Sequence, residues 1–297
     1  MSVYKYGVAN TKKDYSKIAF EGKRSFRDFQ DPISDFPKAG IINSITSGYI
    51  EHELEVARKI QINLLPSQCT GLKGLESACF YEPAHIVGGD YYDMLELDES
   101  HKAFLIGDVS GKGVPASMLM VMIRSIIHYA AQHKVLDKTE AVITELNEYL
   151  RKCLMDSMFV TLFMGVLDEQ NDMLSFCNAG HNYPLIFNGD KEFLELNSGG
   201  LMLGMFDGAK YSRQEARFRY GDLLAMYTDG ITDAIDSEGT PFGADRLKRF
   251  LRDHYRKGIE LNALIDEFKD YYYWFVDPRQ KLDDATLILS LRSREQN

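Results

Sequence analysis

Short runs of apolar or alternating residues, each bounded by turn-forming residues, recur from Gly74 to the end of the chain. They predict β-strands over residues 78–83, 103–107, 159–167, 174–178, 185–187, 213–219, 223–227 and 285–291. Helical periodicity between them predicts helices over residues 115–133, 137–154, 244–255 and 261–275. The strands cluster in blocks and the helices come in adjacent pairs. This order favours an α+β fold, with antiparallel sheets and helices packed outside them.

A further helix is predicted over residues 45–65, with a narrow apolar stripe along one side. The stripe consists of Ile50, Leu54, Ala57, Gln61 and Leu64. Its 4-3-4-3 spacing is that of a coiled-coil seam about two or three heptads long, so the helix either packs on its own domain or forms a dimer seam. Residues 1–43 are polar and carry no recognisable motif. We therefore expect an N-terminal arm (1–43), a linker or switch helix (44–66) and one larger domain (67–297).

Composition and charge exclude several classes of protein. The chain has 297 residues and a formal net charge of −10, whereas nucleic-acid binders usually present a basic face. No stretch approaches the ~20 apolar residues of a membrane helix, and the N-terminus lacks the apolar core of a signal peptide. The four cysteines, Cys69, Cys79, Cys153 and Cys177, show no close pairing, which favours a reducing compartment. We expect a cytoplasmic protein with no membrane span.

Four acidic segments lie at or just beyond apolar runs, each beside glycine or a second carboxylate. They are Val-Gly-Gly-Asp90-Tyr-Tyr-Asp93, Gly-Asp108-Val-Ser-Gly-Lys-Gly, Thr-Asp229-Gly and Asp283-Asp284-Ala-Thr. Any one of them alone reads most simply as a turn, but four at strand ends are hard to explain as coincidence. Strand ends deliver side chains to a rim, and Mg²⁺ and Mn²⁺ prefer oxygen ligands. The segments together predict one centre for two divalent cations, which suits phosphoryl chemistry.

Other chemistries fit the sequence less well. The glycine-rich turn after Asp108 has one residue too few for a P-loop and lacks the Ser or Thr after its lysine. No cysteine is followed six residues later by arginine, as a cysteine phosphatase requires. The loop Asn-Ala-Gly180-His181-Asn182-Tyr-Pro combines a histidine with two amides. It is either a substrate loop or a structural turn.

In their order along the chain, these segments resemble the SpoIIE/RsbU branch of the metal-dependent protein phosphatases, within the type 2C superfamily. The matching strings are residues 57–61, 64–66, 87–93, 107–117, 159–163, 178–184, 203–204, 227–234, 242–243 and 283–286. The resemblance extends over residues 48–292 and leaves residues 1–43 outside it. It implies an α-β-β-α sandwich of two antiparallel sheets flanked by helices, preceded by a short N-terminal linker helix.

The resemblance also implies a ligand set for two cations, Mn²⁺ or Mg²⁺. By motif position the ligands are Asp90, Asp108, the Val109 carbonyl, Asp229 and Asp283, with Asp284 as a further candidate. Asp108 and Asp229 are expected to act in catalysis through the cations and water. Eukaryotic members often carry a histidine two residues after the aspartate that matches Asp108, and here Ser110 stands in that place. The group that protonates the leaving oxygen is therefore unassigned.

The function expected on this basis is a metal-dependent serine/threonine phosphatase. A metal-activated water would remove phosphate from a phosphoserine of a regulatory protein, and the family points to an anti-sigma-factor antagonist. The linker helix would switch activity through an activator protein or through homodimerisation. Two other classes stay open. One is a catalytically silent, metal-binding interaction module of the same fold, and the other is a different two-metal hydrolase, such as a phosphodiesterase.

Overall fold

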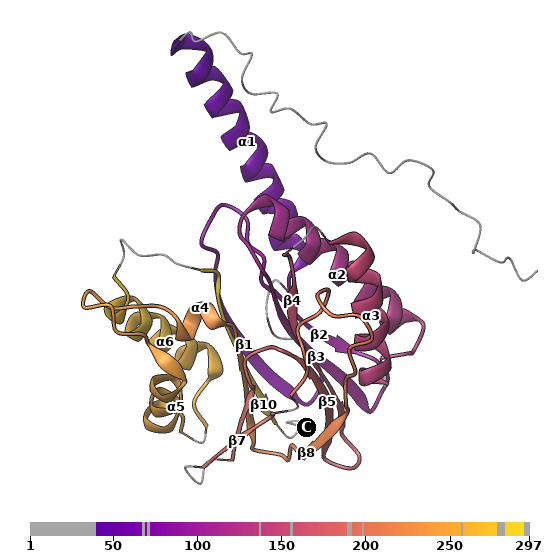
Figure 1. Ribbon diagram of the computed structural model, residues 1–297. Coiled ribbons are helices and arrows are strands. Elements are labelled where there is room, and N and C mark those ends of the chain that lie inside the picture. Colours follow the sequence, from indigo (N-terminus) through magenta and orange to yellow (C-terminus); the bar gives the residue numbers. More distant parts are fainter. Residues whose placement is uncertain are drawn as a thin grey trace, which may run out of the picture. The chain divides into compact units, whose positions relative to one another are not determined.

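The computed structural model describes residues 40–66, 69, 72–136, 138–154, 157–188, 192–197, 199–256, 258–277 and 283–293, with the backbone alone for 40–47. By internal contacts the chain divides into Met1–Gly48 and Tyr49–Asn297. The second unit holds two five-stranded sheets with helices on their outer faces (Figure 1). This is the layered α+β fold expected from the sequence.

The two sheets differ in the order of their strands. Sheet A contains, in spatial order, β1 (Leu75–Glu82), β10 (Ala285–Arg292), β9 (Leu223–Tyr227), β6 (Leu185–Phe187) and β7 (Phe193–Glu195). Sheet B contains β2 (Tyr91–Glu96), β3 (His101–Val109), β4 (Val160–Asp168), β5 (Met173–Ala179) and β8 (Gln214–Arg217). Every strand pairing that the structure describes within these sheets is antiparallel. The predicted antiparallel arrangement is confirmed.

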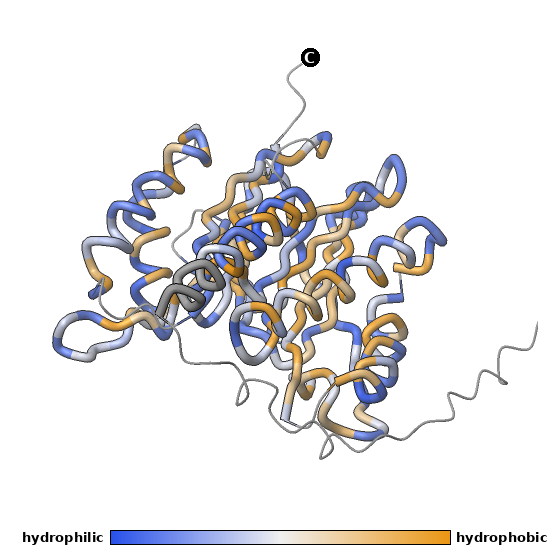
Figure 2. Tube along the Cα trace, turned by 90° about the horizontal axis from the view of Figure 1, so that it is seen from above, coloured by the Kyte–Doolittle hydropathy of each residue, from blue (hydrophilic) through white to orange (hydrophobic). Residues whose placement is uncertain are grey.

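The sequence of β9 shows why these strands form a sandwich. All five of its side chains are buried, and successive residues of a strand point to opposite faces. Tyr227 and its alternate neighbours pack in the cluster that contains α5 (Gly243–His254) and α6 (Leu261–Phe275). Leu224 and Met226 pack in the cluster that contains sheet B. A short uninterrupted apolar run therefore marks a strand covered on both faces, and Figure 2 shows such apolar strands lying between the helices.

Sheet B is covered by α2 (Val114–Gln132) and α3 (Thr139–Cys153), which contact β3 and β5. By length and composition α2 is the one helix of the described residues that could cross a membrane, whereas the sequence analysis expected none. Six of its side chains are buried. Arg124 and His128, which interrupt its apolar sequence, have partners within the unit. Arg124 Nε donates to the Leu64 carbonyl at 2.5 Å, and His128 Nε2 lies 2.6 Å from Asp93 Oδ2.

Three elements were not predicted, and each is short or interrupted by polar residues. They are β2, which carries an aspartate at its centre, the three-residue strand β7, and α4 (Asp229–Thr232). The N-terminal helix α1 spans Gly40–Leu64, close to the predicted bounds. The predicted first residue of α3, Asp137, lies outside the described residues, and the helix begins at Thr139.

The cysteines contradict the expectation that none of them pairs. Cys69 and Cys79 form a disulfide with a Cα–Cα distance of 5.8 Å, which lies within the usual range. They lie ten positions apart, one after the end of α1 and the other in β1, so the fold brings together two residues that form no sequence motif. Cys153 and Cys177 are free thiols. The argument for a reducing compartment from unpaired cysteines therefore does not hold, and a cytoplasmic location stays a prediction.

Candidate metal centre

In sheet B, antiparallel pairing brings two of the predicted ligands together. The start of β2 lies opposite the end of β3, so Asp90, just before β2, approaches Asp108. The Val109 carbonyl faces the same segment, because a Cβ built on Gly89 would lie 2.9 Å from that oxygen. A side chain at position 89 would therefore separate the start of β2 from the end of β3.

In sheet A, the end of β9 lies opposite the start of β10. Asp229 follows β9 as the first residue of α4, and Asp283 and Asp284 precede β10. A Cβ built on Gly230 would lie 2.0 Å from the carbonyl oxygen of Asp284. Only glycine allows α4 to approach the start of β10 this closely, and this approach places Asp229 beside the acidic pair.

Hydrogen bonds from sheet A to Asp90 join the two groups of carboxylates. Asp90 Oδ2 accepts the hydroxyl protons of Thr228 at 2.9 Å and Thr286 at 2.5 Å. We call these two threonines the hydroxyl pair. Asp90 Oδ1 is buried and has no hydrogen-bond partner in the described structure. An unsatisfied buried carboxylate oxygen is costly, and a bound cation would satisfy it.

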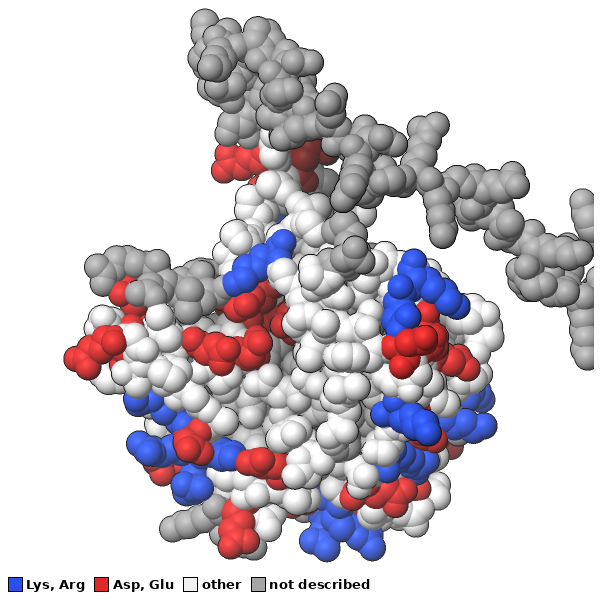
Figure 3. Space-filling view, viewed as in Figure 1, with Lys and Arg blue, Asp and Glu red and all other residues white. Residues whose placement is uncertain are grey.

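We call the region that contains Asp90, Asp108, Asp229 and Asp283 the acidic end. Figure 3 shows acidic side chains gathered beside α4 on the surface. One ammonium group reaches them, since Lys112 Nζ, in the turn after β3, lies 3.1 Å from Asp283 Oδ2.

Asp284 differs from the other carboxylates because both of its oxygens have backbone donors. Oδ1 accepts the N–H of Ala84 at 2.6 Å, and Oδ2 accepts that of Gly89 at 2.5 Å. Its side chain therefore ties the segments before β2 to the start of β10, and so links the two sheets.

Burial and mutual repulsion raise the pKa of Asp90, Asp108 and Asp229 at the acidic end. Burial is the largest cause for Asp108, whose pKa is raised to about 7, and the charges of the neighbouring aspartates add to it. Burial, followed by the charges of Asp108 and Asp284, raises the pKa of Asp90 well above its ordinary value. The pKa of Asp229 is raised by burial and then by Asp283. Repulsion of this kind is what a divalent cation offsets.

The donor set suits Mg²⁺ or Mn²⁺, because every candidate atom is a carboxylate or carbonyl oxygen. Among the described residues, no three acidic, histidine or cysteine side chains already surround one point as a ligand shell does. Carboxylates that repel one another are expected to close on a common point only when a cation lies between them. The buried, unpartnered oxygen of Asp90 is the observation that most directly fits a cation.

We expect the stability of the metal-free protein to fall as the pH rises from the ordinary carboxyl pKa of 3.8 towards about 7. In this range the unfolded chain has lost the Asp108 proton while the folded protein retains it, so the unfolded state binds fewer protons and a higher pH favours it. Asp108→Asn removes this titration. Thermal melts of both proteins in a chelator, at about pH 5 and about pH 7, should show a smaller decrease for the variant. An equal decrease in both would contradict the assignment.

Asp93 is not part of the acidic end, contrary to its grouping with Asp90 in the sequence. It lies inside β2, is buried, and its Oδ2 contacts His128 Nε2 at 2.6 Å and accepts the Tyr91 hydroxyl proton at 3.2 Å. Its side chain therefore joins β2 to α2. No strand was predicted here, so an acidic residue before a strand could not be distinguished from one inside it.

The predicted substrate loop lies beside α4. Its histidine, His181, is 3 % exposed, and its Nδ1 lies 2.8 Å from Thr161 Oγ1. Burial lowers the pKa of His181 to about 3, so the ring is neutral near pH 7. With Gly180 and Asn182 it lines a cavity of about 380 Å³, and Asn182 Nδ2 lies 3.5 Å from Thr232 Oγ1 of α4.

Gln61 connects the predicted switch helix to the acidic end. Its Nε2 donates to the Gly88 carbonyl at 2.6 Å, and the Gly88 N–H donates to its Oε1 at 3.0 Å. The side chain is 4 % exposed, and Leu64 is half-buried. Ile50, at the other end of the stripe, is 52 % exposed. The C-terminal part of the stripe therefore packs on its own unit.

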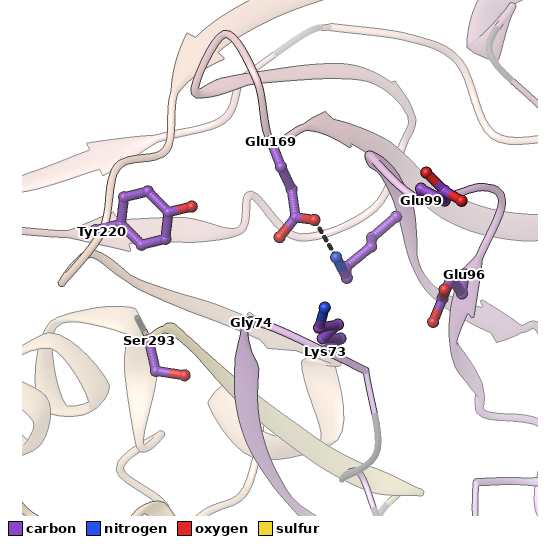
Figure 4. Close-up of a pocket in the computed structure, with 8 residues that line it drawn as sticks. Lys73, Gly74, Glu96, Glu99, Glu169, Tyr220 and Ser293 are labelled. Carbon is purple, nitrogen blue, oxygen red and sulfur yellow. Dashed lines mark hydrogen bonds and ion pairs between the residues drawn. The ribbon is translucent and has the colours of Figure 1, made fainter. Parts of the chain in front are cut away.

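A larger cavity, of about 740 Å³, lies at the opposite ends of the strands (Figure 4). Its wall includes Glu96 at the end of β2, Ser293 just after β10, and the ion pair between Lys102 and Glu169. The candidate ligands stand at the other ends of β2, β3 and β10. This cavity is therefore separate from the acidic end.

Three side chains that the structure brings to the acidic end were not predicted from the sequence. They are Thr228, Thr286 and Lys112. Each lies inside a segment that was already assigned to the metal centre because of its aspartate. Contacts between hydroxyls and carboxylates of two sheets produce no regular spacing in the sequence, so only the packing of the sheets shows them.

Comparison with known protein families shows to which family the chain belongs. The family described as Stage II sporulation protein E (SpoIIE) has a sequence model that matches residues 98–292. The chain belongs to the SpoIIE family. This confirms the resemblance drawn from the motifs.

Two curated relatives of this SpoIIE-family chain are informative. It is 30% identical over 281 residues to Protein IcfG of Synechocystis sp., covering 86% of the chain and 44% of IcfG. It is 27% identical over 244 residues to Phosphoserine phosphatase RsbU of Bacillus subtilis, covering 82% of the chain and 71% of RsbU. The chain thus spans less than half of the first relative and about seven tenths of the second.

Two solved structures share the fold of this SpoIIE-family chain. The SiaA-PP2C domain of Pseudomonas aeruginosa superposes with a TM-score of 0.72 at 24% identity, covering 84% of the chain and 99% of that domain. The PP2C phosphatase domain of SpoIIE from Bacillus subtilis, solved with a fragment of its regulatory domain, gives 0.63 at 20% identity, covering 75% of the chain and 64% of that structure. These similarities confirm the predicted α-β-β-α sandwich.

Proposed function

We propose that the chain is a metal-dependent protein serine/threonine phosphatase that acts on a phosphoserine of a regulatory protein. The observation that carries the proposal is the convergence of Asp90, Asp108, Asp229 and Asp283 at one end of the two sheets, with a buried Asp90 oxygen that has no partner. Support comes from the relative RsbU, which is named a phosphoserine phosphatase.

In this proposal the four aspartates and the Val109 carbonyl hold two divalent cations. When bound, such cations supply a water acidic enough to attack phosphorus near neutral pH and offset charge on the phosphoryl oxygens. Asp284 braces the segment before β2, because both of its oxygens already accept backbone N–H groups. We therefore place it behind the ligands rather than among them. The Lys112 ammonium would attract the substrate phosphate to the acidic end.

We further propose an anti-sigma-factor antagonist as the phosphoprotein substrate, since the chain belongs to the SpoIIE family and is similar to RsbU over 82% of its length. The loop of Gly180, His181 and Asn182 would contact this substrate beside α4. Neutral His181 is held by Thr161, so it would shape the loop rather than transfer a proton.

Regulation is proposed to act through α1. Because Gln61 holds both polar groups of the Gly88 backbone, a movement of the helix would move the segment that leads to Asp90. An activator protein or a second copy that binds the exposed part of the stripe, around Ile50, would change the position of this segment.

Gln61→Leu is expected to lower phosphate release by roughly 10-fold. Leucine fits a similar volume but leaves the buried Gly88 N–H and carbonyl without partners, which costs about 1–3 kcal/mol and loosens the segment before Asp90. Ile60→Gln is the matched control, since Ile60 is on the same helix and 58 % exposed. Phosphate release should be measured at saturating Mn²⁺. If both variants retained wild-type activity, the link through Gln61 would be wrong.

The proposed function is tested by phosphate release from a phosphoserine peptide, with and without Mn²⁺. We expect release that requires Mn²⁺, and none from a phosphodiester, which separates this function from a phosphodiesterase. Bound Mn²⁺ without any release, from either the peptide or p-nitrophenyl phosphate, would contradict the proposal. That result would favour the catalytically silent interaction module.

A further inference from the structure

We infer that the hydroxyl pair, Thr228 and Thr286, positions Asp90 by occupying one of its carboxylate oxygens and leaving the other for a cation. This inference rests on the proposed function, since it assigns a role in building the metal centre to two residues that are not ligands. Both threonines belong to sheet A or its margin, whereas Asp90 precedes the first strand of sheet B.

The hydrogen-bond inventory of the hydroxyl pair supports this arrangement. Thr286 Oγ1 donates its single proton to Asp90 Oδ2 at 2.5 Å. Thr228 Oγ1 accepts the Thr286 N–H at 3.0 Å. Its own proton has two acceptors within reach, Asp90 Oδ2 at 2.9 Å and the Asp284 carbonyl at 3.3 Å. The charged and nearer acceptor is the stronger one.

Asp90 therefore has one oxygen that accepts two hydroxyl protons and one buried oxygen that accepts none. Two hydroxyl donors on Oδ2 fix the rotation of the carboxylate, and Oδ1 is left buried with no partner in the described structure. Without the two hydroxyls no donor would fix the orientation of the carboxylate, and it could rotate. A ligand held in one orientation binds a metal more tightly, because the partners of a ligand set its geometry.

The hydroxyl pair also sets the relative position of the two sheets. Asp229 and Asp283 flank β9 and β10, where the hydroxyl pair stands, and Asp90 approaches from sheet B. Hydrogen bonds from the hydroxyl pair to Asp90 hold the sheet B ligand at a fixed distance from those of sheet A. The two halves of the centre are thus aligned before a cation arrives.

The threonine side chains also have a structural role, which the test must separate from positioning. The Thr228 backbone N–H donates to the Thr286 carbonyl at 3.1 Å, and Thr286 is fully buried in β10. Valine keeps the shape, the β-branched stiffness and the backbone-to-backbone hydrogen bonds, and it replaces the hydroxyl with a methyl group. At position 228 this also removes the acceptor of the Thr286 N–H. Serine keeps the hydroxyl and removes only the methyl group.

The experiment is isothermal titration of Mn²⁺ into the metal-stripped full chain and its variants. We expect Thr286→Val and Thr228→Val each to weaken Mn²⁺ binding by about 10- to 100-fold, and Thr286→Ser to bind within about 3-fold of wild type. Ser290→Ala is the matched control. Ser290 lies on the same strand as Thr286, and its buried hydroxyl is hydrogen-bonded to the Ser77 hydroxyl, away from the acidic end. This variant should bind Mn²⁺ as wild type does.

Melting temperatures in a chelator identify any variant that does not fold. If one of the two valine variants, Thr228→Val or Thr286→Val, is unfolded, Mn²⁺ binding by the other one tests the inference. Valine variants that bind Mn²⁺ as tightly as wild type would overturn the inference and leave the proposed function intact. Equal weakening by valine, serine and Ser290→Ala would also overturn it, since the hydroxyl would not be the cause. Wild-type protein that binds no Mn²⁺ would overturn both proposals.

Discussion

Asp229→Asn is expected to lower phosphate release by about 100-fold or more while the protein remains folded. The amide keeps the shape of the side chain but replaces an anionic oxygen with a nitrogen that cannot bind a cation. The fold should survive, because Asp229 is repelled by Asp283 and the amide removes that repulsion. In a chelator we therefore expect the variant to melt at the same temperature as wild type or slightly higher.

A surface aspartate provides the control for this variant. Asp266 lies on α6, its side chain is 71% exposed, and it pairs with Lys269. Asp266→Asn removes the same charge from the chain without touching the acidic end, so it should retain full activity. Phosphate release and bound Mn²⁺ should be measured for both variants on one preparation of substrate. Normal turnover and metal content in Asp229→Asn would show that this carboxylate is not a ligand.

Gly230→Ala is expected to have the second large effect, on both stability and activity. The new Cβ would lie 2.0 Å from the Asp284 carbonyl oxygen and 2.7 Å from its carbon, so α4 and the start of β10 must separate. We expect a loss of about 2 kcal/mol or more in the free energy of unfolding. We also expect a decrease of about 100-fold in phosphate release, because small displacements of a catalytic group are costly.

The matched control for stability is Gly199→Ala. A Cβ at Gly199 meets nothing within 4 Å, so alanine there should leave the melting temperature unchanged. Chemical denaturation should be measured for both alanine variants, and phosphate release for Gly230→Ala and wild type. If Gly230→Ala unfolded like Gly199→Ala and released phosphate like wild type, the close approach of α4 to β10 would not be essential for the centre.

Strand ends are the part of the fold that the sequence predicted best. The run at β9 is apolar throughout and ends in Tyr-Thr-Asp-Gly, so both the strand and the place of Asp229 at its exit followed from local pattern. The strand that carries Asp93 was missed because Asp93 and Glu96 interrupt its apolar positions and two glycines shortly precede it. Convergence of the four aspartates was inferred from their shared position at strand ends and from the family resemblance, because antiparallel pairing between distant segments leaves no trace in local sequence.

Contacts between segments that are distant in the chain account for what the sequence could not provide. The disulfide of Cys69 and Cys79 depends on how the chain turns after α1. The contact of Gln61 with Gly88 depends on where that helix meets the unit. Gln61 was recognised as part of an apolar stripe, although a buried amide in such a stripe indicates a specific partner. Its two hydrogen bonds to one peptide unit identify that partner.

The acidic end and α1 together indicate how activity and regulation could share one short segment. Gly88 and Gly89 precede Asp90, and their backbone groups bind Gln61 on one side and Asp284 on the other. A Cβ on Gly88 would lie 2.8 Å from Asp284 Oδ2. Because the segment is packed this tightly, we expect a displacement of α1 to move the segment and Asp90 with it.

The central claim is that the four aspartates bind divalent cations at the acidic end. The most direct measurement is anomalous X-ray scattering from a crystal of the full chain soaked in Mn²⁺. We predict two anomalous peaks between the carboxylates of Asp90, Asp108, Asp229 and Asp283, one of them contacting Asp90 Oδ1. Peaks located only elsewhere, or no peak at the acidic end at saturating Mn²⁺, would contradict the account.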